Sequence, residues 1–344
     1  HETTDNAYVG GNLVQVTPRV AGTVVAIGAD DTDLVEAGQA LVRLDPSDAR
    51  IALAQAEAQL AQAVREARVL YAKDTTLAAA LAQRKVDLAR AEDDLARRAP
   101  LVASGAVSKE DLQHARDAVA AARAALKTAG EQLAASRALT EGTAVEKQPS
   151  VLRAAARVRE AFLAVQRDTI PAPVRGYVAK RAVQVGQQVA PGEPLMAVVP
   201  LDDVWVDANF KEVQLRDMRI GQPALLTADL YGSRVEYRGR IAGLAAGTGG
   251  AFALLPPQNA TGNWIKVVQR LPVRIALDRK QLAGHPLRVG LSMEVDVDVR
   301  DASGLELAKT PVSGPVYATS AFDEQAAAAD ARVREIIGAN LGSR

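Results

Sequence analysis

The chain has 344 residues, and its 41 basic side chains balance its 41 acidic ones, so the formal net charge is zero. This balance argues against a nucleic-acid binder, which carries a basic excess on its binding face. Because there is no cysteine and the three histidines lie far apart, disulfide frameworks, thiolate sites and paired-histidine metal motifs are excluded. No catalytic constellation emerges, and we predict a protein that is not an enzyme and has no cofactor and no bound metal.

Two short β-rich segments, residues 16–46 and 170–200, repeat each other at a constant offset of 154 residues. Each reads as short strands punctuated by glycine turns, and neither is large enough to bury a core alone. We therefore predict that the two segments pack together as halves of one β-sandwich. The matched pairs are Gly22 and Gly176, Val35 and Val189, Gly38 and Gly192, Leu41 and Leu195, and Pro46 and Pro200.

The stretch between the two halves predicts a long helical hairpin. The 53 residues between Pro46 and Pro100 contain no glycine or proline, and one helix of that length would run about 80 Å. A heptad repeat, which predicts a coiled-coil seam, is interrupted at Asp74 and Arg84. The seam residues of this first arm are Leu53, Leu60, Ala67, Asp74, Leu81, Leu88 and Leu95, with Ala56, Ala63, Leu70, Leu77, Arg84 and Ala91 three positions on.

A second arm repeats the heptad pattern from Leu112 to Leu133, breaks around Gly142, and resumes from Val151 to Val165. Alanine supplies 30 of the 93 residues from 47 to 139, so two helices can approach closely and form a thin hairpin. The short link at 104–107 forces the arms antiparallel. At this turn Ser108 is in position to cap the second helix, with Glu110 and Asp111 in its first turn.

From Val204 onward the sequence predicts a small barrel of six short strands separated by glycine and proline turns. The segments are 204–210, 223–230, 235–241, 265–268, 271–277 and 293–299. The charge-free run from Ile241 to Ile265 contains too many turn residues for a membrane-spanning helix, and we predict that it is a contact loop. Residues 301–344 are expected to form a loosely ordered tail with one short helix near 324–337.

Four segments give the sequence a resemblance to a known family. They are TDNAYV at 4–9, VWVDANFKE at 204–212, MRIGQP at 218–223, and LLPPQNATGNWIKVVQRLPV at 254–273. With these segments, the layout resembles the periplasmic adaptors, or membrane fusion proteins, of the HlyD family, and most closely its EmrA-type multidrug efflux adaptors. The resemblance covers essentially residues 3 to 300.

The resemblance implies an α+β fold, with a long antiparallel α-helical coiled-coil hairpin inserted between two halves of a lipoyl-like β-sandwich and followed by a β-barrel domain. It also implies a membrane helix upstream of residue 1. The expected segments are 1–15, an N-terminal strand joining the barrel; 16–46, the first lipoyl-like half; 47–168, the hairpin with its tip at about 99–108; 169–200, the second half; 201–300, the barrel; and 301–344, the C-terminal tail.

The implied function is that of a periplasmic adaptor, anchored in the inner membrane of a Gram-negative bacterium. It would link a major-facilitator drug:proton antiporter to a TolC-like outer-membrane channel, as a homo-oligomer that is hexameric in the assembled pump. The alternatives are an adaptor of an ABC-type secretion system and a structural coiled-coil module without a transport role. A lipoyl-type carrier subunit is disfavoured, because the long insertion replaces the turn that would hold its modified lysine.

Two sets of candidate site residues follow. The spacing Arg97-x3-Leu101-x6-Ser108-x3-Leu112 resembles the pattern with which the family's hairpin tip docks on the outer-membrane channel. The simpler interpretation is that Leu101 and Leu112 close the hairpin core while Ser108 caps a helix, and both interpretations are compatible. The second set belongs to the charge-free run and is expected to face the transporter or the membrane; its members are Phe252, Leu254, Leu255 and Trp264.

Overall fold

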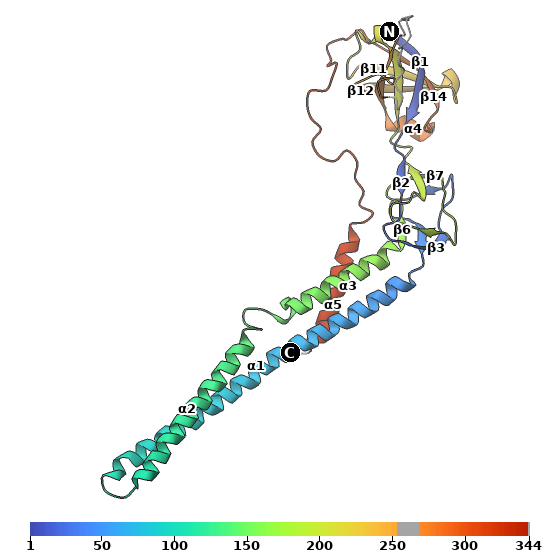
Figure 1. Cartoon of the computed structure of the whole chain (residues 1–344). Helices are drawn as coiled ribbons and strands as arrows, with labels where there is room; N and C mark the ends of the chain where they lie inside the picture. The colour runs from blue at the N-terminus through green and yellow to red at the C-terminus, as the bar shows by residue number, and fades with distance from the viewer. Residues whose placement is uncertain (253–267, 343–344) are drawn as a thin grey trace, which may run out of the picture. The chain divides into compact units, whose positions relative to one another are not determined.

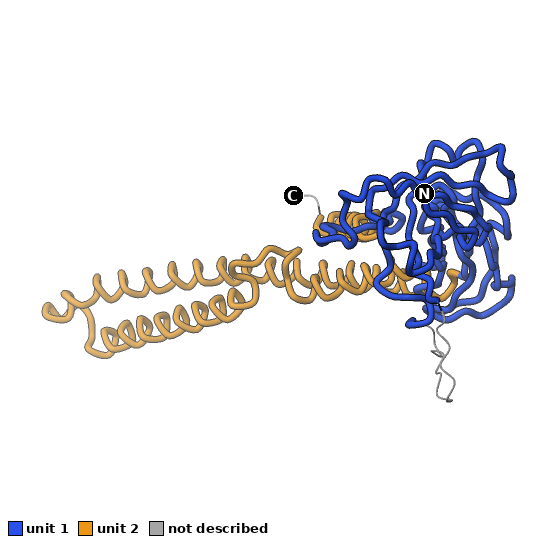
Figure 2. Tube along the Cα trace, turned by 90° about the horizontal axis from the view of Figure 1, so that it is seen from above, with its two compact units in different colours: residues 1–45, 167–323 blue, residues 46–166, 324–344 orange. Residues whose placement is uncertain are grey.

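A computed structural model describes residues 1–252 and 268–342, which form two compact units (Figure 2). The first unit comprises residues 1–45 and 167–323 and contains the β-structure. The second comprises residues 46–166 and 324–344 and is helical. The expected Leu254, Leu255 and Trp264 contact residues lie outside the described part of the chain.

The first unit contains a β-sandwich of two four-stranded sheets, ordered β2-β9-β7-β4 and β6-β5-β3-β8. Each sheet takes two strands from each of the repeated segments, so neither segment folds into a sheet by itself. The prediction of one shared sandwich is confirmed. The strands are β2 (Val14–Val16), β3 (Gly22–Ile27), β4 (Leu34–Val35), β5 (Ala40–Leu44), β6 (Thr169–Pro171), β7 (Gly176–Ala179), β8 (Gln188–Val189) and β9 (Met196–Val199).

The two sheets are equivalent under the offset of 154 residues, because adding it to β2, β3, β4 and β5 leads to β6, β7, β8 and β9. Backbone hydrogen bonds repeat in the same way. The amide of Gly38 donates to the carbonyl of Ala172 at 2.9 Å, and the equivalent amide of Gly192 donates to that of Pro18 at 3.0 Å. Both glycines have φ of +83°, a conformation that favours glycine. The sandwich is therefore two copies of one motif around a shared core.

The same unit contains a closed six-stranded barrel, ordered β1-β10-β13-β12-β11-β14. Alternate residues point inward; in β14, for example, Met293, Val295 and Val297 are buried while Glu294 is exposed. The strands are β1 (Glu2–Gly10), β10 (Trp205–Lys211), β11 (Pro223–Ala228), β12 (Glu236–Leu244), β13 (Arg270–Leu277) and β14 (Ser292–Val297), with helix α4 (Arg279–Gly284) and the 3-10 turns η3 (Glu212–Leu215) and η4 (Gly232–Arg234) between them.

The barrel closes through the first strand of the chain, because β1 pairs with both β10 and β14. Five of the six strands expected after Val204 are present as β10 to β14. The sixth, expected at 265–268, is not found among the described residues: 265–267 fall outside them and Val268 is not in a strand. Without β1, β10 and β14 would leave two unpaired edges, which a closed barrel removes.

The helical unit is built on α1 (Ser47–Arg98), a single helix of 52 residues. Its partners are α2 (Lys109–Arg137) and then α3 (Pro149–Arg167), which follow one another alongside it (Figure 1). The 3-10 turns η1 (Ala99–Val102) and η2 (Val145–Lys147) lie in the two connections. The expected hairpin, including its break near Gly142, is confirmed.

The helical unit also contains a fourth helix, whose packing the sequence analysis did not predict. The helix expected near 324–337 runs over the whole of α5 (Glu324–Leu341), and it packs on α1 and α3 instead of belonging to a loose tail. Ala329, Val333 and Ile336 are spaced at helical intervals and buried. Their apolar stripe covers the part of α1 up to about Ala67. We call this region of α1, α3 and α5 the base. We call the rest of α1, together with α2, the arm.

Candidate functional site

The turn that joins α1 to α2 closes the hairpin within a few residues. Gly105 has φ of +79°, which is favourable only for glycine and a few other residues. Its amide donates to the carbonyl of Val102 at 3.1 Å, and the Ser104 hydroxyl donates to the carbonyl of Leu101 at 2.8 Å. These local bonds satisfy two carbonyls at the end of η1 and hold the turn compact.

Ser108, one of the expected docking residues, is the N-cap of α2. Its hydroxyl accepts a hydrogen bond from the Asp111 amide at 2.9 Å and donates one to the Asp111 carboxylate at 2.6 Å. This interaction holds the pKa of Asp111 below its usual range. The negative charge also lies in the first turn of α2, where the helix dipole favours it. The structural role expected for Ser108 is thus present.

The other three docking candidates differ in accessibility. Leu101 is 45% exposed, whereas Leu112 is half-buried against the arm. The side chain of Arg97 is 72% exposed and reaches Asp94 only at 3.6 Å, while that of its neighbour Arg98 is 43% exposed and lies 2.8 Å from the same carboxylate. Arg97 is therefore the more available cation of the two.

The four docking candidates consequently fall at one end of the hairpin, within residues 97–112. The outward-facing members are a cation, Arg97, and an aliphatic side chain, Leu101. Such a surface can form an apolar contact and donate several hydrogen bonds from one guanidinium.

The second candidate set is represented in the described residues by Phe252 alone. Its side chain is 74% exposed, and its ring lies over Gly247, where an added Cβ would come within 2.7 Å of the ring. Leu254, Leu255 and Trp264 lie outside the described residues.

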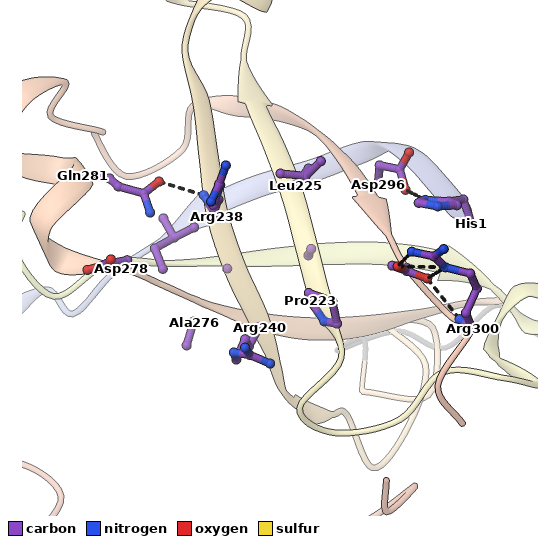
Figure 3. Close-up of a pocket in the computed structure, with 14 residues that line it drawn as sticks. His1, Pro223, Leu225, Arg238, Arg240, Ala276, Asp278, Gln281, Asp296 and Arg300 are labelled. Carbon is purple, nitrogen blue, oxygen red and sulfur yellow. Dashed lines mark hydrogen bonds and ion pairs between the residues drawn. The ribbon is translucent and has the colours of Figure 1, made fainter. Parts of the chain in front are cut away.

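The barrel carries an open groove of about 830 Å³ that sequence reasoning missed (Figure 3). Arg300 forms a two-pronged ion pair with Asp298, and this pairing lowers the pKa of Asp298 to about 2. Nδ1 of His1 lies 2.7 Å from Asp296. The lining contains no serine, threonine, cysteine or lysine, and two of its carboxylates are paired with neighbouring side chains. In the sequence, the alternation of Asp296 and Asp298 with valines is a signal for this charged face of the barrel.

Within residues 1–252 and 268–342, no group of three or more histidine, aspartate or glutamate side chains could hold a metal ion. No helix in the same residues is long and apolar enough to cross a membrane.

Comparisons with known proteins extend the geometric picture. Residues 47–168 match the family model of the EmrA alpha-helical hairpin domain. The chain is 49% identical over 341 residues to the multidrug export protein EmrA of Escherichia coli K12, covering 99% of this chain and 87% of that protein. It is 53% identical over 337 residues to the fatty acid resistance protein FarA of Neisseria gonorrhoeae, covering 97% and 84% respectively.

Among solved structures, the chain is similar to the periplasmic adaptor protein EmrA, with 19% identity, a TM-score of 0.43, and coverage of 86% of this chain and 98% of that one. The sequence relatives decide the assignment, because identity near one half extends over nearly the whole chain and most of each relative. The chain belongs to the EmrA-type family of periplasmic adaptor, or membrane fusion, proteins.

Proposed function

We propose that this chain is the adaptor subunit of a tripartite multidrug efflux pump. It works in the periplasm, anchored in the inner membrane, and links a major-facilitator drug:proton antiporter to a TolC-like outer-membrane channel. Relatives named for multidrug export and for fatty acid resistance support this role. The adaptor has no catalytic step of its own, and its contribution to export is mechanical connection.

The observation that carries the proposal is the shape of the helical unit. A helix of 52 residues has a length of about 78 Å at 1.5 Å per residue. It is stiffened by α2 and α3 and ends in a compact turn with an exposed Leu101. A long element that carries a small recognition surface at its end suits a connector between two membranes better than it suits a binding pocket or a catalyst.

At the tip, we assign different roles to the four candidates. Arg97 and Leu101 contact the channel, because their side chains face solvent. Ser108 and Leu112 act indirectly: the first caps α2 and the second closes the seam, so together they present Leu101 at the proper place.

At the barrel, the loop that includes Phe252, Leu254, Leu255 and Trp264 faces the transporter or the membrane surface. The exposed ring of Phe252 supports this assignment, because a large apolar group left in water often marks a contact surface. A single thin hairpin cannot enclose a conduit, so several copies assemble, and six are expected in the pump.

Affinity purification of the full-length protein from its own membranes, after mild chemical cross-linking, tests the choice of partners. Recovery of a major-facilitator transporter and an outer-membrane channel is the expected result. Recovery of an ABC transporter instead would replace the proposal by the secretion-system alternative, and recovery of neither at native abundance would favour a structural module.

Export assays on tip variants test the docking assignment. Leu101→Asp and Arg97→Ala should abolish or strongly reduce drug resistance, since one central interface contact is worth about 2 kcal/mol or more. The matched controls lie elsewhere on α1: Val69→Asp changes a side chain that is 66% exposed, and Arg84→Ala removes an arginine that pairs with Asp87 three residues on. Both controls should export normally.

A further inference from the structure

In the arm of the hairpin, the apolar seam does not by itself determine which residues of α2 lie opposite which residues of α1. Its seam is built largely from small and similar residues, such as Ala115, Val119, Ala129 and Leu133 on α2. A seam of this kind repeats every seven residues, so sliding α2 by a heptad along α1 would bury nearly the same set of side chains. Apolar packing alone does not strongly select one alignment.

The polar residues buried in the hairpin are concentrated at one place. Among the described residues of 47–167 they are Ser136, Thr140 and Gln148. All three lie where α2 ends and α3 begins, opposite Tyr71 and Asp74 of α1. This is also where α1 changes its partner, since its buried residues up to Ala67 pack in the base.

Hydrogen bonds join this cluster across the hairpin, from α1 to the segment between α2 and α3. The Thr140 hydroxyl donates to Oδ2 of Asp74, and the Tyr71 hydroxyl donates to the carbonyl of Thr143. Nε2 of Gln148 donates at 3.0 Å both to the Tyr71 hydroxyl and to the carbonyl of Leu139. The cluster therefore ties two positions of α1 to the segment between α2 and α3.

The cluster includes one of the two flaws in the predicted seam. The other flaw, Arg84, has a side chain that is 54% exposed and pairs with Asp87 at 3.4 Å, so it does not interrupt the core. Asp74 does face the junction. Its Oδ1 is buried and makes no hydrogen bond of good geometry among the described residues, although the nearby Ser136 hydroxyl helps to lower the pKa of Asp74.

Polar groups of this kind discriminate between registers because their cost depends on alignment. A shift by one heptad would place Ala67 or Leu81 where Asp74 now accepts its hydrogen bond. Thr140 would then be buried without its partner, and leaving a buried polar group unpaired is costly. A single polar residue in an otherwise apolar seam is a known means of fixing alignment at some loss of stability.

We infer that Asp74, with Thr140 and the Tyr71–Gln148 pair, is a positioning cluster that fixes the axial register of the hairpin and thereby the position of its tip. This inference rests on the proposed docking of the tip. The cluster touches no partner itself. It acts by holding α2, and with it Ser108 and Leu112, at one height along α1.

The test replaces Asp74 by a residue that completes the seam. Asp74→Leu should leave the helical content and thermal stability unchanged or raised, yet allow more than one register. Asp74→Asn keeps a hydrogen-bond acceptor and should retain one register and most of the export. Asp93→Leu is the matched control, because it makes the same chemical change at an exposed position of α1.

Register is read by spin-label distances, which the cysteine-free chain makes simple. Labels at Val86→Cys on α1 and Glu110→Cys on α2, both exposed positions, report axial sliding. The parent protein, Asp74→Asn and Asp93→Leu should each give one narrow distance. Asp74→Leu should add a second population, corresponding to an axial shift of about 10 Å, which is the length of one heptad in a helix.

Drug export in cells is measured for the same variants. Broadened distances together with lost export for Asp74→Leu support the inference. One narrow distance with full export overturns it, and so does one narrow distance with lost export. Broadened distances with full export would show that the tip tolerates sliding, which contradicts the positioning role and the docking proposal together; failure of the Leu101→Asp assay alone would contradict only docking. If Asp74→Leu does not fold, Thr140→Val removes the same hydrogen bond and is read in the same way.

Discussion

The β-sandwich and the helical hairpin fix the alignment of their paired segments by different interactions. In the sandwich, the two repeated segments are joined by backbone hydrogen bonds, and equivalent bonds occur in both copies of the repeat, as Gly38–Ala172 and Gly192–Pro18 show. In the arm of the hairpin, the two helices meet only through side chains, most of them small. Alignment of the sandwich therefore depends on the backbone, whereas alignment of the arm depends on a few particular side chains.

The base of the hairpin is intermediate between these two cases. Three helices surround its core, and ion pairs between α5 and the other two add directional contacts, such as Arg159 with Asp330 at 2.5 Å. The comparison predicts that the base resists unfolding more than the arm. It also predicts that the sandwich is most sensitive to substitution where two backbone segments come into close contact.

The largest expected loss of stability follows removal of a core side chain of the base. Leu60 is fully buried among three helices, so Leu60→Ala should lower the free energy of unfolding of the helical unit by about 2 to 5 kcal/mol. Leu88→Ala, at the same heptad position in the two-helix arm but only half-buried, should cost clearly less. Helical circular dichroism during thermal unfolding measures both, and equal losses would contradict the distinction between base and arm.

The next effect tests backbone packing in the sandwich. Gly22 and Gly176 are equivalent in the repeat, but a Cβ at Gly176 would lie 2.6 Å from the carbonyl oxygen of Val199, whereas one at Gly22 would meet the Leu44 side chain at 3.2 Å. Backbone cannot move aside as a side chain does. Gly176→Ala should therefore destabilise by about 1 to 3 kcal/mol and Gly22→Ala by less, as measured by denaturant unfolding. A larger loss of stability for Gly22→Ala than for Gly176→Ala would contradict this explanation.

A smaller effect concerns the attachment of α5. Arg332 donates to both carboxylate oxygens of Glu57, at 2.6 and 3.0 Å, and also contacts Glu335 at 2.8 Å. Because this pair is partly exposed, Arg332→Ala should cost only about 1 kcal/mol. Arg334→Ala, on the exposed side of the same helix, should cost almost nothing. Added salt should narrow the difference in melting temperature between the two variants, and an unchanged difference would argue against the ion pair.

The smallest effect is the acid sensitivity of the positioning cluster. Hydrogen bonding from Ser136 and Thr140 lowers the pKa of Asp74 in the folded chain. Its stabilising contribution is therefore complete above the unfolded pKa of about 4 and is lost as pH falls through the lower folded pKa. Asp74→Asn should lose less helical stability than the parent protein between pH 5 and pH 2, as followed by circular dichroism. An equal slope would show that Asp74 contributes no pH dependence.

Much of the fold could be predicted because its signals are local or periodic. The constant offset from Gly22–Gly176 to Pro46–Pro200 predicted a shared sandwich, and the heptads starting at Leu53 and Leu112 predicted the hairpin. The docking of α5 was harder to predict, since its stripe of Ala329, Val333 and Ile336 identifies a helix without identifying what it covers.

The docking role of the tip stays a prediction. Resemblance to the family's tip pattern grouped Arg97, Leu101, Ser108 and Leu112 around one turn, and only side-chain geometry separates the exposed Leu101 from the capping Ser108. Asp74 was recognised as a flaw in the seam. Its partner Thr140 could not be identified from the repeat, because Thr140 lies beyond the regular heptads, in the segment where the pattern breaks.

The most direct test of the adaptor role is photo-cross-linking in living cells from a reactive amino acid placed at Leu101, with the same amino acid at Val69 as the control. The side chains at both positions are exposed on the hairpin. The predicted result is a covalent complex with the outer-membrane channel from position 101 and none from position 69. A protein that still exports drugs but forms no channel complex from position 101, or forms equal amounts from both positions, would contradict docking through the tip.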